Sequence, residues 1–378
     1  MSRFFDLVSR QLREMGGYTP SPPSRASNGH RQLVRLDSNE NPFGPSPKAV
    51  EAMRVTLAST GMYPDDDCTQ LRRKVAGLHE LPPEQVLVTA GSTGMLALLC
   101  QTLLGPGLNA VTGERSFIVY GMAVQAAGAQ LVTVPMREDG LDLDAMQQAI
   151  NEDTRIVFVA NPNNPTGTLL DAAAIDKFLN EVPGQVVVVL DEAYYEFAAD
   201  FAARRKVEYS RSLQYVKQGA SVVVLRTFSK VHGLAGLRIG YGMGPAELLS
   251  YCVRMRSTFS VSSVAQAAAF AALDDTTHIG RTVSNNSEQA QILGVGLSEM
   301  GFRVIPTWAN FLCCDLGRDA GEVAEQLRSQ GISVRPLGGW GAPNCLRVSI
   351  GTAAQNRGLL EAMEKDLSSP AASGTHSG

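Results

Sequence analysis

The sequence predicts an α/β fold: a large domain built on a mostly parallel sheet with helices on both faces, and a smaller α+β domain. Four short runs rich in β-branched residues, each ending in a polar or glycine-rich turn, have the length of buried strands and alternate with helical segments: 86–90, 156–160, 186–190 and 222–224. The last third differs, because the segments 302–305, 310–314 and 346–350 are typical of a small antiparallel sheet. A chain of 378 residues is long enough for both units.

The composition is that of an ordinary globular protein. Hydrophobic residues make up 44% and charged residues 19%, and the net charge of −4 suggests neither a nucleic acid nor an anionic membrane as partner. The richest apolar stretch, from Val264 to Leu273, is about half the length of a membrane-spanning helix. Six scattered cysteines form no CxxC pair, so we expect reduced thiols in a cytoplasmic protein and no metal site.

The chain divides into four parts. We expect residues 1–45 to be an N-terminal segment that contributes to the small domain and to dimer contacts. Its first sixteen residues have the pattern of a short amphipathic helix, without the apolar core of a secretory signal. Residues 46–270 form the predicted large domain, which opens with a helix at Pro47. Residues 271–367 form the predicted small domain. An alanine-rich helix after Ser263 is expected to lead into it, and a further helix is expected around 287–300. The small, polar residues 368–378 are expected to be a disordered tail.

The first strand of the large domain runs directly into Gly91-Ser92-Thr93-Gly94, before a helix expected from Met95 to Leu104. Free backbone N–H groups at a helix N-terminus, together with the hydroxyls of Ser92 and Thr93, can bind a phosphate. A Gly-Ser turn can equally cap a helix without binding anything.

Two further turns present side chains that suit a planar ligand. Phe117, in the segment 115–120, is either a core residue or a lid over a flat ring. The turn NPNNPTG follows the strand 156–160, and its two Asn-Pro steps keep it out of helix, so that Asn164 can point into a cleft.

The last two strands end in residues that bear charge. Asp191 follows four consecutive valines and Leu190, and a carboxylate in such a place is costly unless it is paired; Tyr194 lies three residues on. The final strand leads to Thr227, Ser229 and Lys230, with Arg238 among glycines. A lysine past a buried strand end can shift its pKa and form a Schiff base, although most such lysines, like most such aspartates, are only solvated or salt-bridged.

Taken together, a lysine, an acid, an anion-binding turn and an aromatic ring at strand ends are what pyridoxal phosphate requires. In this order the motifs SNENPFGPSP, YPDDD, NPNNPTG, DEAYYEF, RTFSKVHGLAGLRIGY and VRPLGG…LRVSIGT resemble those of the fold-type I pyridoxal-phosphate aminotransferases, class I/II. The resemblance covers residues 18–367 and is strongest to the histidinol-phosphate aminotransferase branch. It implies a seven-stranded sheet in the large domain and a homodimer with shared active sites.

The resemblance also implies a role for each residue. Lys230 would hold the cofactor as a Schiff base and shuttle the proton, Asp191 would pair with the ring nitrogen, and Tyr194 would bind the phenolic oxygen. The remaining cofactor contacts would come from Asn164, Phe117, Ser92, Thr93, Thr227, Ser229 and Arg238, and from Tyr63 of the neighbouring subunit. Arg347 would grip the substrate carboxylate, since a guanidinium binds a carboxylate in bidentate fashion, and the other substrate contacts would be Tyr18, Asn39 and Arg335.

The resemblance leaves the substrate open. Asp315 stands where many relatives carry an arginine, and it would repel a phosphorylated substrate if its side chain pointed inward; His232 replaces an aromatic residue. The expected reaction is a ping-pong transfer between a small amino donor, either histidinol phosphate or an aromatic amino acid, and the 2-oxo acid 2-oxoglutarate. A lyase or decarboxylase of the same branch is the alternative. A non-catalytic protein is disfavoured because Lys230, Asp191 and Arg238 are all present.

Overall fold

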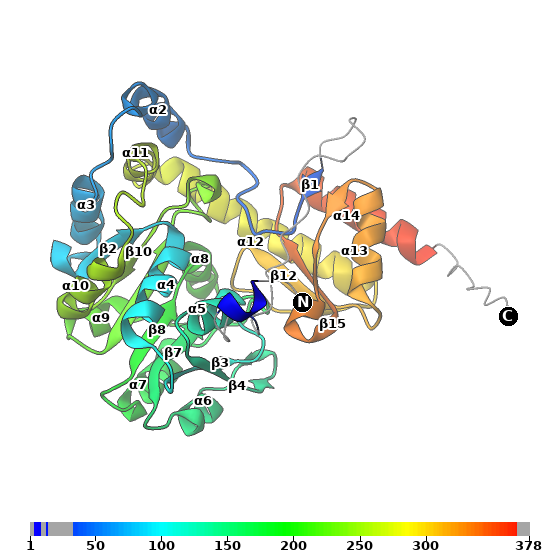
Figure 1. The fold of residues 1–378 in the computed structure, drawn as a ribbon. Coiled ribbons are helices and arrows are strands. Elements are labelled where there is room, and N and C mark those ends of the chain that lie inside the picture. Colours follow the sequence, from blue (N-terminus) through cyan, green and yellow to red (C-terminus); the bar gives the residue numbers. More distant parts are fainter. Residues whose placement is uncertain (1–3, 9–12, 14–32, 369–378) are drawn as a thin grey trace.

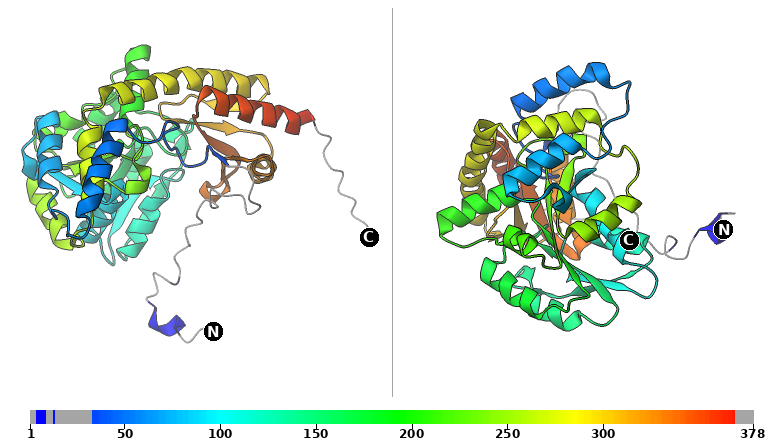
Figure 2. Two further views of the ribbon diagram at one scale, coloured as in Figure 1. Left: turned by 90° about the horizontal axis from the view of Figure 1, so that it is seen from above. Right: turned by 90° about the vertical axis from the view of Figure 1, so that its left-hand side faces the viewer.

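The computed structural model describes residues 4–8, 13 and 33–368, and it has a large and a small lobe (Figure 1). The 24-residue helix α12 (Thr276–Glu299) starts at the large lobe and continues along the small one, where it contacts α14 (Ala353–Ser368). Figure 2 shows α12 and α14 side by side above the small sheet. The two lobes are therefore joined by a continuous helix as well as by the N-terminal segment.

The large lobe contains a seven-stranded sheet in which one strand, β10, runs antiparallel to both of its neighbours. The other pairs are parallel, so the expected mostly parallel sheet is confirmed. The strand order is β2 (Val86–Thr89), β10 (Gly240–Met243), β9 (Val222–Thr227), β8 (Val187–Asp191), β7 (Thr154–Ala160), β3 (Asn109–Gly113) and β4 (Gln130–Val134).

Helices cover both faces of this sheet, as expected for parallel strands whose two sides are apolar. One face packs against α2 (Pro47–Thr56), α3 (Thr69–His79), α6 (Leu143–Ala149), α7 (Ala172–Glu181), α9 (Ser212–Lys217) and α11 (Ser263–Ala272). The other face packs against α4 (Gly91–Leu103), α5 (Val119–Ala126) and α10 (Ala246–Met255), while α8 (Tyr195–Arg205) lies next to α12.

The small lobe is built on a four-stranded antiparallel sheet. Its order is β11 (Arg303–Ile305), β12 (Phe311–Asp315), β15 (Ala342–Ser349) and β14 (Arg335–Leu337), and α12, α13 (Ala320–Ser329) and α14 cover it. The N-terminal segment joins this lobe, because β1 (Val34–Arg35) pairs in parallel with β13 (Ile332–Ser333). The remaining short elements are η1 (Phe5–Leu7), η2 (Leu57–Ser59), η3 (Pro83–Gln85), η4 (Ala235–Leu237), η5 (Gly338–Trp340), β5 (Met136–Arg137) and β6 (Gly140–Leu141).

Several elements differ from the sequence expectation, and strands β3 and β4 are among those that were not predicted. Helix α4 begins at Gly91 and not at Met95, so the small residues form its first turn. Helix α12 starts at Thr276, because the Asp275 side chain accepts a hydrogen bond from the His278 N–H and caps it. Strand β10 was not predicted, because its glycines hide the strand pattern.

Part of the predicted N-terminal helix and the predicted disordered tail lie outside the described residues. Among the residues that are described, no helix combines the length and the apolar character needed to cross a bilayer.

Candidate active site

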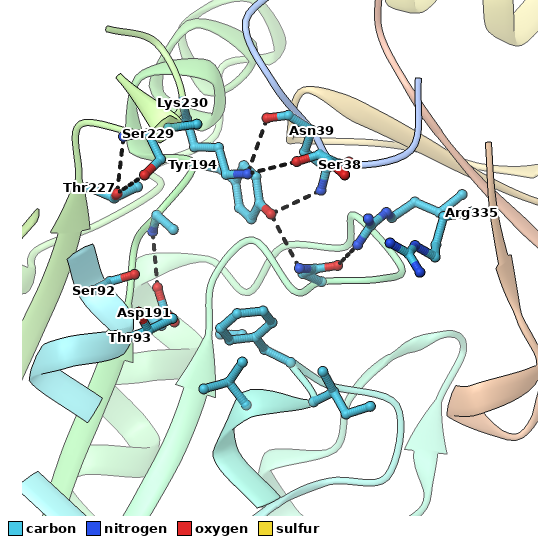
Figure 3. Close-up of a pocket in the computed structure, with 18 of the residues that line it drawn as sticks. Ser38, Asn39, Ser92, Thr93, Asp191, Tyr194, Thr227, Ser229, Lys230 and Arg335 are labelled. Carbon is cyan, nitrogen blue, oxygen red and sulfur yellow. Dashed lines mark hydrogen bonds between the residues drawn. The ribbon is translucent and has the colours of Figure 1, made fainter. Parts of the chain in front are cut away.

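A cavity of about 800 Å³ opens where the carboxyl ends of the parallel strands face the small lobe. Strand ends of this kind are the usual place for a ligand in α/β proteins. Most of the residues singled out from the sequence line it (Figure 3): Asn39, Ser92, Thr93, Phe117, Asn164, Asp191, Tyr194, Thr227, Ser229, Lys230, Arg238, Arg335 and Arg347.

One end of the cavity is a cradle of hydroxyl and N–H groups. Arg238 donates from Nη2 to Thr93 Oγ1 at 3.4 Å and from Nη1 to Ser229 Oγ at 3.4 Å, and Ser229 Oγ lies 3.0 Å from Thr227 Oγ1. These side chains surround the N-terminus of α4, whose unpaired amides carry a partial positive charge. A cation, a helix end and three hydroxyls together form an anion site.

Glycine is required in this cradle. Gly91 has a φ of +76°, and a Cβ on it would lie 2.6 Å from Nη2 of Arg238. A Cβ on Gly240 would lie 2.7 Å from the backbone N of Ser92. Larger residues at these positions would push the arginine and the helix end out of place.

Asp191 lies at the floor of the cavity, at the end of β8, and is 5% exposed. Its Oδ2 accepts a hydrogen bond from the Tyr120 hydroxyl at 2.9 Å and its Oδ1 accepts one from the Ala193 N–H at 3.2 Å. Burial raises the pKa of Asp191 to about 6, although the Tyr120 and Ala193 hydrogen bonds act in the opposite direction. The sequence offered no sign of this contact, because Tyr120 and Asp191 are 71 positions apart in the chain.

Tyr194 and Asn164 lie together on the wall of the cavity. The Tyr194 hydroxyl accepts hydrogen bonds from Nδ2 of Asn39 at 3.1 Å and from Nδ2 of Asn164 at 3.3 Å. Both Tyr194 and Asn164 are buried, and each belongs to the loop after a different strand. Asn39 reaches them from the N-terminal segment, with its own backbone N–H donating to Ser349 Oγ at 2.7 Å.

Lys230 points into the same space from the loop after β9 (Figure 3). Its Nζ donates to the carbonyl oxygens of Asn39 at 3.1 Å and Ser38 at 3.3 Å, and it lies 5.4 Å from the centre of the Tyr194 ring. Burial, followed by the charge of Arg347, lowers the pKa of Lys230 to about 7. Much of the amine is therefore neutral, and nucleophilic, at physiological pH.

Two arginines from the small lobe face the large-lobe wall of the cavity. Arg335 and Arg347 are directly paired across β14 and β15, so two like charges are neighbours. Arg347 is 6% exposed, donates from Nη1 to Asn164 Oδ1 at 2.6 Å, and donates from Nη2 to the Asp37 carbonyl at 2.8 Å. Its Nε has no hydrogen-bond partner, which leaves a buried donor for an anionic ligand.

One predicted site residue, Tyr63, does not line this cavity. Tyr63 is 80% exposed and stacks on Phe259 with ring centres 4.4 Å apart. Tyr18 lies outside the described residues. Two residues that the sequence reasoning missed do line the cavity: Arg35, and Trp340, whose indole N–H donates to the Ser116 carbonyl at 2.9 Å.

The condition under which Asp315 would repel a phosphorylated substrate, a side chain that points inward, is not met. Its Oδ1 accepts a hydrogen bond from the Gly317 N–H at 2.9 Å, its Oδ2 lies 3.9 Å from Nη2 of Arg303, and it does not line the cavity. The side chain therefore does not face a substrate. His232 is likewise buried away from the cavity, with its ring 5.0 Å from that of Phe228.

A seven-stranded sheet with a single reversed strand, and a lysine after the strand that pairs with it, define the class: a fold-type I enzyme that uses pyridoxal phosphate. The family model described as "Aminotransferase class I and II" matches residues 31–363. The chain belongs to this family, within its histidinol-phosphate aminotransferase-like branch.

Named relatives align with this chain over most of its length. It is 42% identical over 372 residues to histidinol-phosphate aminotransferase 2 of Pseudomonas aeruginosa, covering 97% of this chain and 99% of the relative. It is 41% identical over 340 residues to histidinol-phosphate aminotransferase of Moorella thermoacetica, covering 90% of this chain and 86% of the relative. Among solved structures, histidinol-phosphate aminotransferase from Sinorhizobium meliloti in complex with pyridoxal-5'-phosphate superposes with a TM-score of 0.86 at 27% identity, covering 97% of each chain.

The residues of this chain fit that cofactor. The cradle around the N-terminus of α4 suits its phosphate, and the glycines there leave the space that a phosphate needs. Asp191 has a buried carboxylate for the ring nitrogen, and Lys230 has an amine with a lowered pKa for the aldehyde. Phe117, half-buried in the cavity wall, is placed to cover a flat ring.

Proposed function

We propose that this aminotransferase takes its amino group from histidinol phosphate, with an aromatic amino acid as the competing donor, and passes it to 2-oxoglutarate. The observation that carries the proposal is the paired Arg335 and Arg347 in the cavity that holds Lys230, with the buried Nε of Arg347 left unbonded. Two adjacent cations with a free donor suit an anionic substrate group, which both kinds of donor and the acceptor possess. The names of the relatives support histidinol phosphate as the donor.

The cofactor, when bound, supplies an electron sink that stabilises negative charge at the substrate Cα. The residues of the chain supply the rest. Asp191, buried and bonded by two donors, would hold the ring nitrogen in its protonated form. Tyr194, fixed by Asn39 and Asn164, would hold the phenolic oxygen and keep the ring from turning.

Lys230 would serve as the proton-transfer group. Its pKa of about 7 lets the amine accept a proton from the substrate Cα and return one at neutral pH. The Ser38 and Asn39 carbonyls accept hydrogen bonds from its Nζ and so hold the amine at the cavity wall. Because one site would serve both halves of the reaction, the donor product would leave before the acceptor binds, which is a ping-pong order.

The proposal includes a homodimer with shared active sites, in the cytoplasm. Large apolar side chains are exposed along residues 55–63 of the large lobe, at Val55, Leu57, Met62 and Tyr63, and the Tyr63 ring stacks on the exposed Phe259. Such a surface favours association with another chain, and a second copy would cover it. Tyr63 would then reach the cofactor phosphate of the partner subunit. All six cysteines are free and buried, as is usual for a protein of a reducing compartment.

A donor screen tests the proposed reaction. Histidinol phosphate, phenylalanine and phosphothreonine are each supplied with 2-oxoglutarate, and glutamate is measured. We expect glutamate from histidinol phosphate or phenylalanine, and parallel lines in double-reciprocal plots when both substrates are varied. Release of CO2 without glutamate would overturn transamination in favour of the lyase alternative.

A further inference from the structure

The buried carboxylate of Asp191 depends on few partners. In the described part of the chain it accepts hydrogen bonds from one side chain, Tyr120, and from one backbone N–H, that of Ala193, and no lysine or arginine lies within ion-pair distance. The charges of Glu192, which raises the pKa of Asp191, and of Lys230, which lowers it, oppose each other, so the hydrogen bonds are the main groups that stabilise the ionised form against burial. Among the side chains of the described residues, Tyr120 therefore has the largest influence on Asp191.

The position of the Tyr120 side chain is fixed by its packing. Its side chain is 0% exposed, and its ring lies face to face with Phe158, with centres 4.5 Å apart and planes 6° apart. On another side it meets the edge of Phe117 at 5.6 Å and 88°. The packing of α5 against β7 thus aims the hydroxyl at Oδ2 of Asp191.

We propose that Tyr120 is a positioning residue for the cofactor ring: its hydroxyl keeps Asp191 ionised and turned toward the ring nitrogen. The inference rests on the proposed function, since Asp191 needs a ring nitrogen to act on. Tyr120, which also lines the cavity, would act on the ring nitrogen through the hydrogen bond that its hydroxyl donates to Asp191. The sequence motifs give no role to the Tyr120 hydroxyl.

The direction in which Tyr120 changes the pKa of Asp191 follows from the hydrogen bond between them. Donation to the charged form stabilises the carboxylate, and burial already raises the pKa of Asp191 to about 6. Removing the hydroxyl raises that pKa further, so that Asp191 is protonated over a wider range near neutral pH. Removing the hydroxyl should therefore weaken cofactor binding strongly at pH 6.5. It should weaken binding less at pH 9, where the Asp191 carboxylate ionises even without Tyr120.

The test measures the dissociation constant of pyridoxal phosphate for the protein stripped of cofactor, between pH 6 and 9, for wild type and Tyr120→Phe. Loss of a hydrogen bond to a charged group, worth about 1.5–3 kcal/mol, would raise the pKa of Asp191 by about one to two units and so weaken the affinity at pH 6.5 by about three- to fortyfold. The same titration is made with a deaza analogue, in which a C–H replaces the ring nitrogen. Wild type and Tyr120→Phe should bind this analogue equally.

Tyr215→Phe is the matched control. The Tyr215 hydroxyl also donates to an aspartate, Asp176, but outside the cavity, so cofactor affinity should not change at any pH. A second variant, with 3-fluorotyrosine at position 120, keeps the ring and hydroxyl and so avoids the folding defect that Tyr120→Phe could cause. Its more acidic phenol is a stronger hydrogen-bond donor and should move the pH profile of cofactor affinity to lower pH.

Three results would overturn the inference. Tyr120→Phe could bind the cofactor as wild type does at every pH, or it could lose affinity equally for the cofactor and the deaza analogue, as a merely structural residue would. Wild-type protein that binds neither compound would overturn the inference and the proposed function together, whereas the first two results leave the proposed function standing.

Discussion

Nη1 of Arg347, on the small-lobe strand β15, lies 2.6 Å from Oδ1 of Asn164, in the large-lobe turn after β7. Nδ2 of the same amide donates to the Tyr194 hydroxyl at 3.3 Å. One amide therefore connects the arginine proposed to bind substrate with the tyrosine proposed to bind the cofactor ring. The position of the small lobe and the geometry of the cofactor site are thus linked through the Asn164 side chain, and also through Asn39, which contacts Ser349 of β15 and Tyr194.

The first prediction follows from this link. Arg347→Lys keeps a positive charge but removes the planar pair of donors and the Nε donor. We expect kcat/KM for both phenylalanine and 2-oxoglutarate to fall about ten- to 150-fold, with cofactor affinity nearly unchanged. Arg303→Lys, on the exposed end of β11, is the control and should leave both constants unaltered. An equal loss in the two variants would contradict a role in substrate binding.

The second prediction concerns the pH dependence of Lys230. Its pKa of about 7 means that the neutral amine is most of the population above pH 7 and a minority below it. Covalent capture of pyridoxal phosphate, followed by stopped-flow absorbance, should be about tenfold slower at pH 6 than on the alkaline plateau.

Arg347→Met tests the cause of this pKa. Arg347 is the leading charge that lowers the pKa of Lys230, so its removal should raise that pKa and move the whole capture profile to higher pH. An unmoved profile would show that burial alone sets the reactivity of the amine.

The third prediction concerns Gly91. Gly91→Ala places a Cβ against Arg238 and forces a side chain onto a backbone with φ of +76°. The new Cβ displaces Nη2 of Arg238, and because a charge-assisted contact is worth about 1.5–3 kcal/mol, we expect the affinity for pyridoxal phosphate to drop about tenfold or more. Pyridoxal without its phosphate should bind both proteins alike. Gly77→Ala, in α3 with open space around the new Cβ, is the control.

The fourth prediction concerns stability. Glu192 is 2% exposed and accepts hydrogen bonds from Arg226 Nη2 at 2.9 Å and Nε at 3.2 Å, which ties β8 to β9 below the site. Arg226→Met leaves a buried carboxylate without its cation and should lower the free energy of unfolding by about 3–5 kcal/mol in urea titrations. Asp144→Asn, which breaks the exposed pair with Lys177, should leave the unfolding midpoint nearly unchanged. Similar midpoints for the two variants would contradict this reading of the buried pair.

The sequence predicted best what is local and strongly patterned. The strands ending at Asp191 and Thr227 are continuous β-branched runs, so both the parallel sheet and the place of its charged residues could be foreseen. The two Asn-Pro steps likewise fixed Asn164 in a turn at a strand end. Each of these positions depends on neighbours along the chain, which a sequence pattern reports directly.

What could not be foreseen depends on residues far apart in the chain. Tyr120 meets Asp191 across 71 positions, and Trp340 meets Ser116 across 224, and neither pairing has a local pattern. The orientation of Asp315 could not be foreseen for the same reason, because only the pairing of β11 with β12 places it opposite Arg303 and outside the cavity.

The most direct test of the central claim is to trap the cofactor on Lys230. Protein loaded with pyridoxal phosphate is reduced with borohydride and digested, and the modified lysine is located by mass spectrometry. We predict a single pyridoxyl adduct on the peptide that contains Lys230, and its loss in Lys230→Ala. An adduct on another lysine, or none at all, would contradict the account.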